Sequence, residues 1–319
     1  MAAFLAALAA TLPFFAVIGC GAVAVWRGLM EERAVKGVHA FVFYFALPCL
    51  IFRAFATRDL GEILRIDYLL AYGIPTLLVY LCAVAAGLAI FRLKLGEAAL
   101  HGQAGAVSNA GFLGIPLIVG VMGEAAAPPV VIAILWDLVV TITLSILLLE
   151  VAEARASEAG RKIGATVLQA LKGAMLNPFV LSIAAGIAWS AGGFGLPGPI
   201  AVLIDLLADA APPAALFALG ASLWGKPISS GVKEVASMSV FKLIVHPAAV
   251  AFVCFTLYPV DPFWAAAGVL TAALPVAANV FIIGGRYGRY IARASTAILI
   301  STLIAVVSTP LVILWLGVG

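Results

Sequence analysis

The chain has 319 residues, of which 65% are hydrophobic and only 10% charged, with a mean hydropathy of +1.19. This composition excludes a soluble globular domain, and the net charge of +3 gives no support to nucleic-acid binding. A bilayer core takes roughly 20 apolar residues per helix, so the long apolar runs predict an all-α polytopic membrane protein and exclude an outer-membrane barrel. We expect ten transmembrane helices, at 4–26, 38–56, 68–91, 100–122, 129–150, 173–191, 199–224, 236–258, 263–284 and 295–316.

The first segment lacks a basic leader and runs beyond the apolar core of a signal peptide, so we interpret it as a retained helix. The cysteines lie far apart in apolar segments, a pattern that predicts neither a disulfide nor a metal site: Cys20, Cys49, Cys82 and Cys254. The sequence contains no Walker motif, no HExxH and no nucleophile elbow. We therefore expect no enzymatic activity and no cofactor.

Basic residues are sorted between alternate loops. Fifteen of the 18 lysines and arginines belong to one set, which lies mostly in the loops that follow the odd-numbered segments. The other three are Arg53, Arg58 and Arg65. The positive-inside rule makes the loops of the larger set cytoplasmic. Both chain ends are then expected outside, with the protein in a bacterial inner membrane.

The fourth segment contains VSNAGFLGIPL, residues 107–117. Pro116 has no amide hydrogen and its ring clashes with the carbonyl four residues back, so we expect the helix to break or kink near Phe112. Gly111 and Gly114 let the backbone leave helical geometry there. Unwound backbone is tolerated in a bilayer only where protein or a wet cavity covers it, so this stretch should line a cavity.

Asp137, in AILWDLVV, lies inside the fifth segment, where an ionisable side chain is costly unless it faces a cavity or a partner. It is a candidate for binding a proton, a cation or a substrate amine, and its neighbour Trp136 could line the same pocket. The alternative is a structural role, in which Asp137 accepts a hydrogen bond from a neighbouring helix.

The connection 151–172 is the longest cytoplasmic loop and separates two groups of five segments, 1–150 and 173–319. An odd number of helices gives the two groups opposite orientations. A shift of 165 residues matches the groups at Pro13 and Pro178, Gly21 and Gly186, Pro48 and Pro213, and Phe52 and Phe217. Inverted repeats of this kind are typical of secondary transporters, whose binding site lies near the midplane.

Asp205 and Asp209 of the seventh segment are four residues apart and so lie on one face of a helix. They are candidates for a coupling-cation site, with an exposed helix end as the alternative. His246 in the eighth segment is a candidate proton relay, although such a histidine more often satisfies a local carbonyl. Arg53 and Lys242 lie near segment ends, where long side chains usually reach the interface, and we assign neither a role.

The ninth segment contains LPVAANVFIIGGRYG, with Pro275, Asn279 and Gly284. Asn109 and Gly114 are five residues apart, as are Asn279 and Gly284. Broken helices in these matching positions of two inverted halves can cross. The unpaired N–H groups of half-helix N-termini suit an anion, and the two asparagines add neutral donors. The alternative is that these residues only kink helices and fill helix contacts.

The chain resembles the auxin efflux carrier family, which includes plant PIN proteins and bacterial malonate-type carriers. The resemblance covers nearly the whole length through RGLMEERAVKGVHAFVFYFALPCLIFRAF, SNAGFLGIPL, DAAPPAALFALGASL, FKLIVHP and LPVAANVFIIGGRYG. It implies a crossover-type carrier with a scaffold of helices 1, 2, 6 and 7. Helices 3–5 and 8–10 would form a transport unit that slides like an elevator, and the scaffolds would join a homodimer.

The resemblance also implies that the crossover of helices 4 and 9 holds the substrate carboxylate, with a pocket beside it. The candidate substrate-binding residues are Asn109, Gly111, Gly114, Pro116, Trp136, Asp137, Asn279 and Val280, to which we add Leu50; the helix breaks are assigned to Gly114, Pro116, Pro275 and Asn279. PIN helix 9 has a second proline where this chain has Val280, and the connector is short. Plant-type regulation through that connector is therefore unsupported, and these departures count against indole-acetate itself as the cargo.

The sequence predicts a secondary carrier that moves a small organic anion, an auxin-like carboxylate or a dicarboxylate, by alternating access. Expulsion of an anion from a negative interior needs no coupled ion, so we expect export; import would need sodium or protons, with Asp137 as the coupling candidate. One alternative is an ion-coupled carrier of the bile-acid symporter type, although such a carrier would place a carboxylate at the crossover. The other is a membrane sensor, which usually carries a soluble domain.

Overall fold

The computed structural model describes residues 2–57, 65–156, 168, 172, 175–193, 195–225 and 231–318. Within these residues the structure is helical, apart from loops and one isolated β-bridge. Seven helices are long and apolar enough to cross a membrane, and three shorter apolar helices accompany them. The structure therefore indicates an integral membrane protein. Most of the predicted connector 151–172 lies outside the described residues.

The N-terminal part forms α1 (Ala2–Trp26), then α2 (Glu32–Phe41), η1 (Val42–Ala46) and α3 (Leu47–Ala56) as one helix, followed by α5 (Ile66–Ala89) and α6 (Leu95–Ala106). After a break come η2 (Ala110–Gly114), α7 (Ile115–Met122), η3 (Glu124–Ala126), α8 (Ala127–Trp136), η4 (Asp137–Ile142) and α9 (Thr143–Ala156). The label η marks a π-helical turn, except for η3, which is a 3-10 turn.

The C-terminal part begins with α11 (Pro178–Ala191) and α12 (Gly198–Leu223). One long helix follows, made of α13 (Val232–Val240), η5 (Phe241–Val245), α14 (His246–Phe252) and η6 (Val253–Leu257). The chain ends with α15 (Pro262–Ala272), α16 (Asn279–Arg286) and α17 (Ile291–Leu316).

Two helices are interrupted near the centre of the molecule. The first break separates α6 from η2 at residues 107–109, and the second separates α15 from α16 at residues 273–278. Pro275 lies inside the second break, and Asn279 is the first residue after it. The sequence predicted that both segments break, but the first break lies upstream of Gly111 instead of at Gly114 and Pro116.

Pro116 sits inside a helix because a π turn precedes it. It is the second residue of α7, directly after η2, and Pro48 and Pro247 hold the same position after η1 and η5. A π turn widens the helix and shifts its hydrogen bonds by one residue, which moves the carbonyl that the proline ring would otherwise meet. The π turn thus accommodates the proline ring, and the helix continues beyond it.

Two helix pairs cross through glycines. A Cβ on Gly21 of α1 would overlap the Phe217 carbonyl of α12, and a Cβ on Gly186 of α11 would lie 3.0 Å from the Phe52 carbonyl of α3. The two contacts correspond to each other under the 165-residue shift found in the sequence. Small residues let membrane helices approach closely, so these crossings hold α1 to α12 and α3 to α11.

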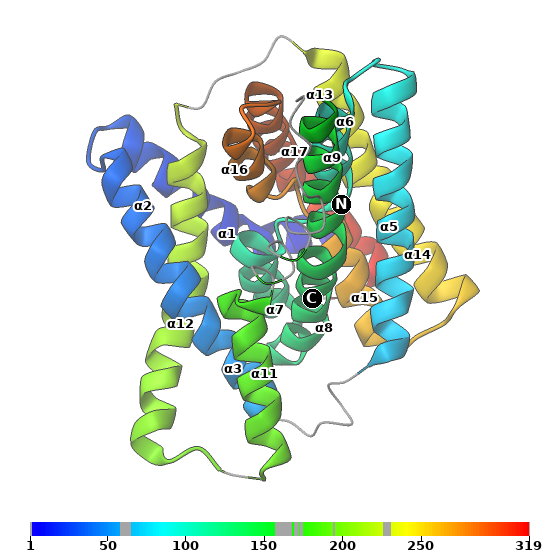
Figure 1. Cartoon of the computed structure of the whole chain (residues 1–319). Coiled ribbons are helices and arrows are strands. Elements are labelled where there is room, and N and C mark those ends of the chain that lie inside the picture. Colours follow the sequence, from blue (N-terminus) through cyan, green and yellow to red (C-terminus); the bar gives the residue numbers. More distant parts are fainter. Residues whose placement is uncertain are drawn as a thin grey trace.

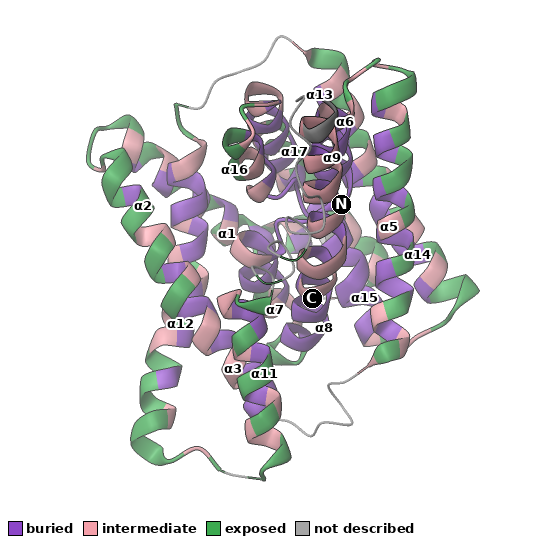
Figure 2. Cartoon of the chain, in the orientation of Figure 1, coloured by how far each residue is buried: buried purple, intermediate pink, exposed green. Residues whose placement is uncertain are grey.

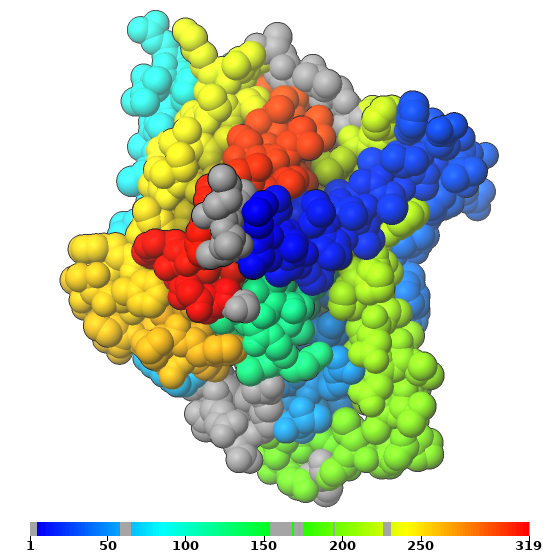
Figure 3. All heavy atoms as spheres, turned by 180° about the vertical axis from the view of Figure 1, so that it is seen from behind, coloured from blue at the N-terminus to red at the C-terminus, as the bar shows by residue number. Residues whose placement is uncertain are grey.

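The helices form two sides around a buried centre. In Figure 1, α3, α11 and α12 lie on one side, and α5 and α14 on the other. The residues between them, in α6, α8 and α15, are mostly buried (Figure 2). Large apolar side chains on outward faces are exposed, as expected of a lipid-facing surface: Leu12, Leu78, Ile304 and Leu311. Helix α1 packs on α17, which brings the chain ends to one face (Figure 3).

The glycine crossing makes a stability prediction. We expect Gly21→Val to destabilise the protein by about 1–3 kcal/mol, because the larger side chain forces α1 away from α12. Thermal unfolding in detergent, followed by loss of the monodisperse species, measures the effect. Gly19→Val is the matched control, since a Cβ at Gly19 meets nothing within 4 Å. Equal losses in both variants would contradict a specific contact at Gly21.

Candidate functional site

The two unwound segments pair with each other. Asn109 N donates to the Pro275 carbonyl at 3.0 Å and Ala277 N donates to the Val107 carbonyl at 3.2 Å, around an antiparallel bridge of Ser108 and Val276. Val276 N donates outward, to Ser301 Oγ of α17 at 3.0 Å. Backbone that has left a helix inside a membrane thus finds its partners in the second unwound segment and in a neighbouring helix.

This crossing places four half-helix ends together. The helices α6 and α15 end there, and η2 and α16 begin there. Helix N-termini leave N–H groups without intrahelical partners and carry partial positive charge, whereas C-termini carry partial negative charge. The centre of the molecule therefore offers one place for an anion and another for a cation.

Buried polar atoms without a hydrogen-bond partner gather at the crossing. They are Ser108 Oγ and Asn109 Nδ2 on the first unwound segment, with Asp137 Oδ1 from η4, Thr141 Oγ1 from the same turn and Tyr72 OH from α5. Ser108 and Asn109 are only 5% and 3% exposed. Tyr72 lies close to Ser108 and Thr141 lies close to Asp137, so these side chains can satisfy one another. Asn109 Nδ2 is a buried donor without a partner, and it marks the candidate contact for a polar ligand.

Asp137 is the buried anion of this site. The side chain is 3% exposed, and its Oδ2 accepts only a long hydrogen bond, 3.5 Å, from Ser108 N. The π turn η4 begins at Asp137. Such turns are frequent at functional sites. The carboxylate therefore faces the unwound backbone, and this contact fits both the functional role and the structural role that the sequence analysis considered for Asp137.

Lys242 is the buried cation of the site. The sequence analysis expected it to reach the membrane interface, but its exposure is 0%, and it belongs to η5 in the middle of a long helix. Its Nζ donates to the carbonyl of Ala272, the last residue of α15, and lies 3.0 Å from His246 Nδ1. An ammonium group is stabilised at a helix C-terminus. Lys242 thus neutralises the half-helix end that the crossing exposes.

The hydrogen bonds around His246 fix its tautomer. Thr76 Oγ1 donates its single hydrogen to the Tyr72 carbonyl at 2.7 Å, so it can only accept from His246 Nε2, at 2.9 Å. His246 Nε2 therefore carries the hydrogen, and Nδ1 accepts from Lys242. The imidazole is neutral in this arrangement, and the positive charge resides on Lys242. The local carbonyl partner expected for His246 is replaced by a side chain on α5.

The candidate residues downstream of each break surround the crossing. Asn279 Oδ1 accepts from Gln103 Nε2 of α6 at 3.4 Å, which ties the start of α16 to the end of α6. Gly111 faces the ring of Phe179, and Gly114 faces Leu274 in the second break. Pro116 and Val280 are buried in α7 and α16.

Trp136 and Leu50 lie beside the site instead of within its polar cluster. A Cβ on Gly73 of α5 would overlap the Trp136 ring, so the indole packs directly on that helix. Leu50 is 2% exposed and belongs to the apolar core that also contains Leu113 and Phe179. Both positions are compatible with an apolar wall of a pocket.

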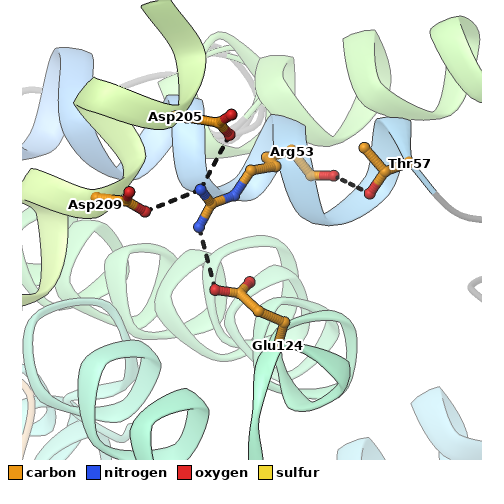
Figure 4. A network of polar contacts seen from close by, with 5 residues as sticks. All are labelled: Arg53, Thr57, Glu124, Asp205 and Asp209. Atoms are coloured by element: carbon orange, nitrogen blue, oxygen red, sulfur yellow. Dashed lines mark hydrogen bonds and ion pairs between the residues drawn. The ribbon is translucent and has the colours of Figure 1, made fainter. Parts of the chain in front are cut away.

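Asp205 and Asp209 belong to a different cluster. Figure 4 shows Arg53 of α3 pointing toward both, with Nη1 at 3.1 Å from Asp205 Oδ1 and 2.9 Å from Asp209 Oδ1. Its Nη2 lies 3.1 Å from Glu124 Oε1 of η3. The three carboxylate side chains are 54–70% exposed. The two aspartates therefore neutralise Arg53 near the molecular surface, and we do not retain them as coupling residues.

Sequence reasoning missed Lys242, Thr76 and Ser108. The motif FKLIVHP shows a lysine four residues before a histidine, which is the helical spacing of a contact. That spacing was the available signal for the pair of Lys242 and His246. No local pattern indicates Thr76, because its role depends on α5 packing against α14.

Comparisons with known proteins identify the family of this chain. The family model described as Membrane transport protein matches residues 6–313, so the chain belongs to this family. The chain is 34% identical over 295 residues to a "Putative malonate transporter" of Rhizobium meliloti (strain 1021), covering 92% of this chain and 91% of that protein. The family resemblance seen in the motifs is confirmed, and the chain is a membrane transporter.

More distant relatives extend over the same length. An "Uncharacterized transporter" of Methanothermobacter thermautotrophicus is 26% identical over 287 residues, covering 89% of this chain and 90% of that protein. The "Uncharacterized transporter YfdV" of Escherichia coli (strain K12) is 24% identical over 304 residues, covering 94% of each. These relatives are transporters by name, which fits a protein without enzymatic activity.

The buried network makes a second prediction. We expect Thr76→Val to lower the free energy of unfolding by about 1–2 kcal/mol, because His246 Nε2 loses its acceptor in a buried place. Thr302→Val is the control, since the Thr302 hydroxyl is also buried but bonds only the Ile298 carbonyl of its own helix, at 2.7 Å. Thermal unfolding of both variants in detergent measures the difference. A Thr76 variant no less stable than the control would contradict the assigned tautomer network.

Proposed function

We propose that this transporter is a secondary carrier of a small organic anion that works by alternating access. The observation that carries the proposal is the crossing at residues 107–109 and 273–278, where Ser108 and Asn109 have buried polar atoms without partners. A carboxylate bound there would accept from Asn109 Nδ2 and from the Ser108 hydroxyl. The N-terminal ends of η2 and α16 would add their partial positive charge.

The reciprocal glycine crossings support an inverted repeat. Gly21 meets Phe217 and Gly186 meets Phe52, as two structurally equivalent halves would require. We accordingly propose ten transmembrane helices in which the short α11 and the two interrupted helices count as spans. The scaffold would be α1, α2 with α3, α11 and α12, and the remaining helices would form the transport unit, with both chain ends outside and two scaffolds joined in a dimer.

The chemistry of the site indicates the substrate class. Lys242 supplies one buried positive charge next to the crossing, and Asn109 supplies a neutral donor, so the site suits carboxylates better than cations or neutral sugars. The name of the relative from Rhizobium meliloti makes malonate the first dicarboxylate to test. A carrier of this kind needs a gradient and no ATP.

The substrate proposal is tested by counterflow in proteoliposomes. Vesicles loaded with unlabelled malonate, or with another anion of a mono- and dicarboxylate panel, should accumulate the labelled anion. We expect Asn109→Ala to reduce the rate at least about tenfold, since a charge-assisted hydrogen bond to the substrate contributes on the order of 1.5–3 kcal/mol. Ser222→Ala is the control, because the Ser222 hydroxyl bonds only the Leu219 carbonyl of its own helix. Counterflow that is unaffected by Asn109→Ala would place the anion elsewhere.

The division into scaffold and transport unit predicts that Arg53 and Glu124 separate during transport, since α3 and η3 fall in different units. We expect a bifunctional thiol reagent to arrest counterflow in Arg53→Cys/Glu124→Cys protein. The exposed Cys20 and Cys82 are replaced by alanine beforehand. Each single cysteine variant is the control, and cleavage of a reducible reagent should restore activity. Full activity of the cross-linked protein would contradict the proposed movement.

A further inference from the structure

The site contains one buried positive charge and one buried negative charge. Lys242 is 0% exposed and Asp137 is 3% exposed, and the two interact electrostatically. Lys242 bonds Ala272 and His246, whereas Asp137 accepts from Ser108 N and lies close to Thr141, so within the described residues neither side chain forms a direct ion pair. The positive charge of Lys242 and the negative charge of Asp137 therefore balance each other, although the two side chains are not in direct contact as an ion pair.

The titratable groups that face these charges are few. Tyr72 of α5 interacts with Asp137, and its side chain also lies close to Ser108 of the first unwound segment. His246 of α14 faces Lys242 and is neutral in the hydrogen-bond network derived above. From the crossing itself, Asp137 receives only the backbone of Ser108. The charges of these side chains consequently sum to zero.

An anion that enters this site disturbs the balance. Its carboxylate would place a second negative charge beside Asp137, with Lys242 as the single positive charge. Two like charges in a site of low dielectric repel strongly, and one of them is normally neutralised by a proton. Asp137 Oδ1 has no hydrogen-bond partner, so it can carry that proton without breaking an existing bond.

We propose that Asp137 takes up one proton for each anion that binds at the crossing, and that Lys242 then becomes the counter-charge of the bound anion. This inference rests on the proposed function of the site as an anion carrier. In the empty state the ammonium of Lys242 balances the carboxylate of Asp137. In the loaded state a new O–H bond neutralises Asp137 and the ammonium balances one substrate carboxylate, so the sum is zero for a monocarboxylate and −1 for the malonate dianion.

This coupling has consequences for ion use and direction. Because Lys242 supplies the counter-charge of the bound anion in this proposal, we expect transport without sodium. Because the proton gradient of a bacterial membrane is directed inward, proton coupling drives uptake, in contrast to the export expected for an uncoupled anion carrier. The coupling residue of the sequence analysis, Asp137, thus keeps its role but acts on protons.

The experiment uses the reconstituted full-length protein with labelled malonate as the probe. The membrane potential is clamped at zero with potassium and valinomycin, sodium is replaced by choline, and the outside is made more acidic by one pH unit. One coupled proton then gives an accumulation of about tenfold, because one pH unit is a tenfold difference in proton activity. Protein-free vesicles correct for passive entry of the protonated acid.

Two variants separate coupling from binding. Asp137→Asn imitates the protonated side chain, so it should retain malonate counterflow, which needs no proton movement, and lose the accumulation driven by the pH gradient. Lys242→Gln removes the counter-charge and should lose both activities. Asp261→Asn is the matched control, since the exposed Asp261 caps α15 by accepting from Phe263 N and Trp264 N and an asparagine can do the same. It should behave like the wild type.

The outcomes separate this inference from the proposed function. Wild-type counterflow without accumulation in the pH gradient overturns proton coupling and leaves the anion carrier intact. Accumulation that persists in Asp137→Asn also overturns it, because the proton would then travel elsewhere. Absence of counterflow with malonate and with every anion of the panel overturns the anion carrier and the coupling together. Loss of accumulation alone in Asp137→Asn supports the inference.

Discussion

The need to satisfy backbone polar groups away from water governs the centre of this protein. Two helices unwind there, and each unwound segment supplies hydrogen-bond partners to the other, at Asn109 and Pro275 and at Val107 and Ala277. Neither break would be tolerated alone, because an orphan N–H or carbonyl in a membrane costs several kcal/mol. The pairing therefore requires both breaks at the same depth, and this fixes where four half-helix ends and their partial charges lie.

The charged side chains follow from that arrangement. Lys242 bonds the carbonyl of Ala272 at a helix C-terminus, and Asp137 accepts from Ser108 N in the first break. Each of the two charges thus compensates backbone groups that the breaks expose, and together they make the site neutral. A neutral site with unpartnered donors at Ser108 and Asn109 is suited to receive an anion only together with a positive charge, which connects the fold to the proposed proton coupling.

The prolines show which helix interruptions can be predicted from the local sequence and which cannot. The sequence correctly indicated interruptions in the segments that contain Pro116 and Pro275, since proline and glycine disfavour helix there. It misplaced the first break because a π turn absorbs Pro116, as similar turns absorb Pro48 and Pro247. Whether a proline ends a helix or follows a widened turn depends on which carbonyls find partners in neighbouring helices, and no short stretch of sequence contains that information.

The sequence by itself determined the membrane class, the apolar segments and the two interrupted helices, because composition and periodicity are local properties, and it made Asn109 and Asp137 candidate site residues. Only the tertiary structure decided that Lys242 is buried and that Arg53 neutralises Asp205 and Asp209. A long basic side chain near a helix end has two arrangements of low energy: it reaches the membrane interface, or it pairs with a buried partner. The choice between them depends on partners such as Ala272 for Lys242 and Asp209 for Arg53, which are 30 and 156 positions away and come into contact only when the helices pack.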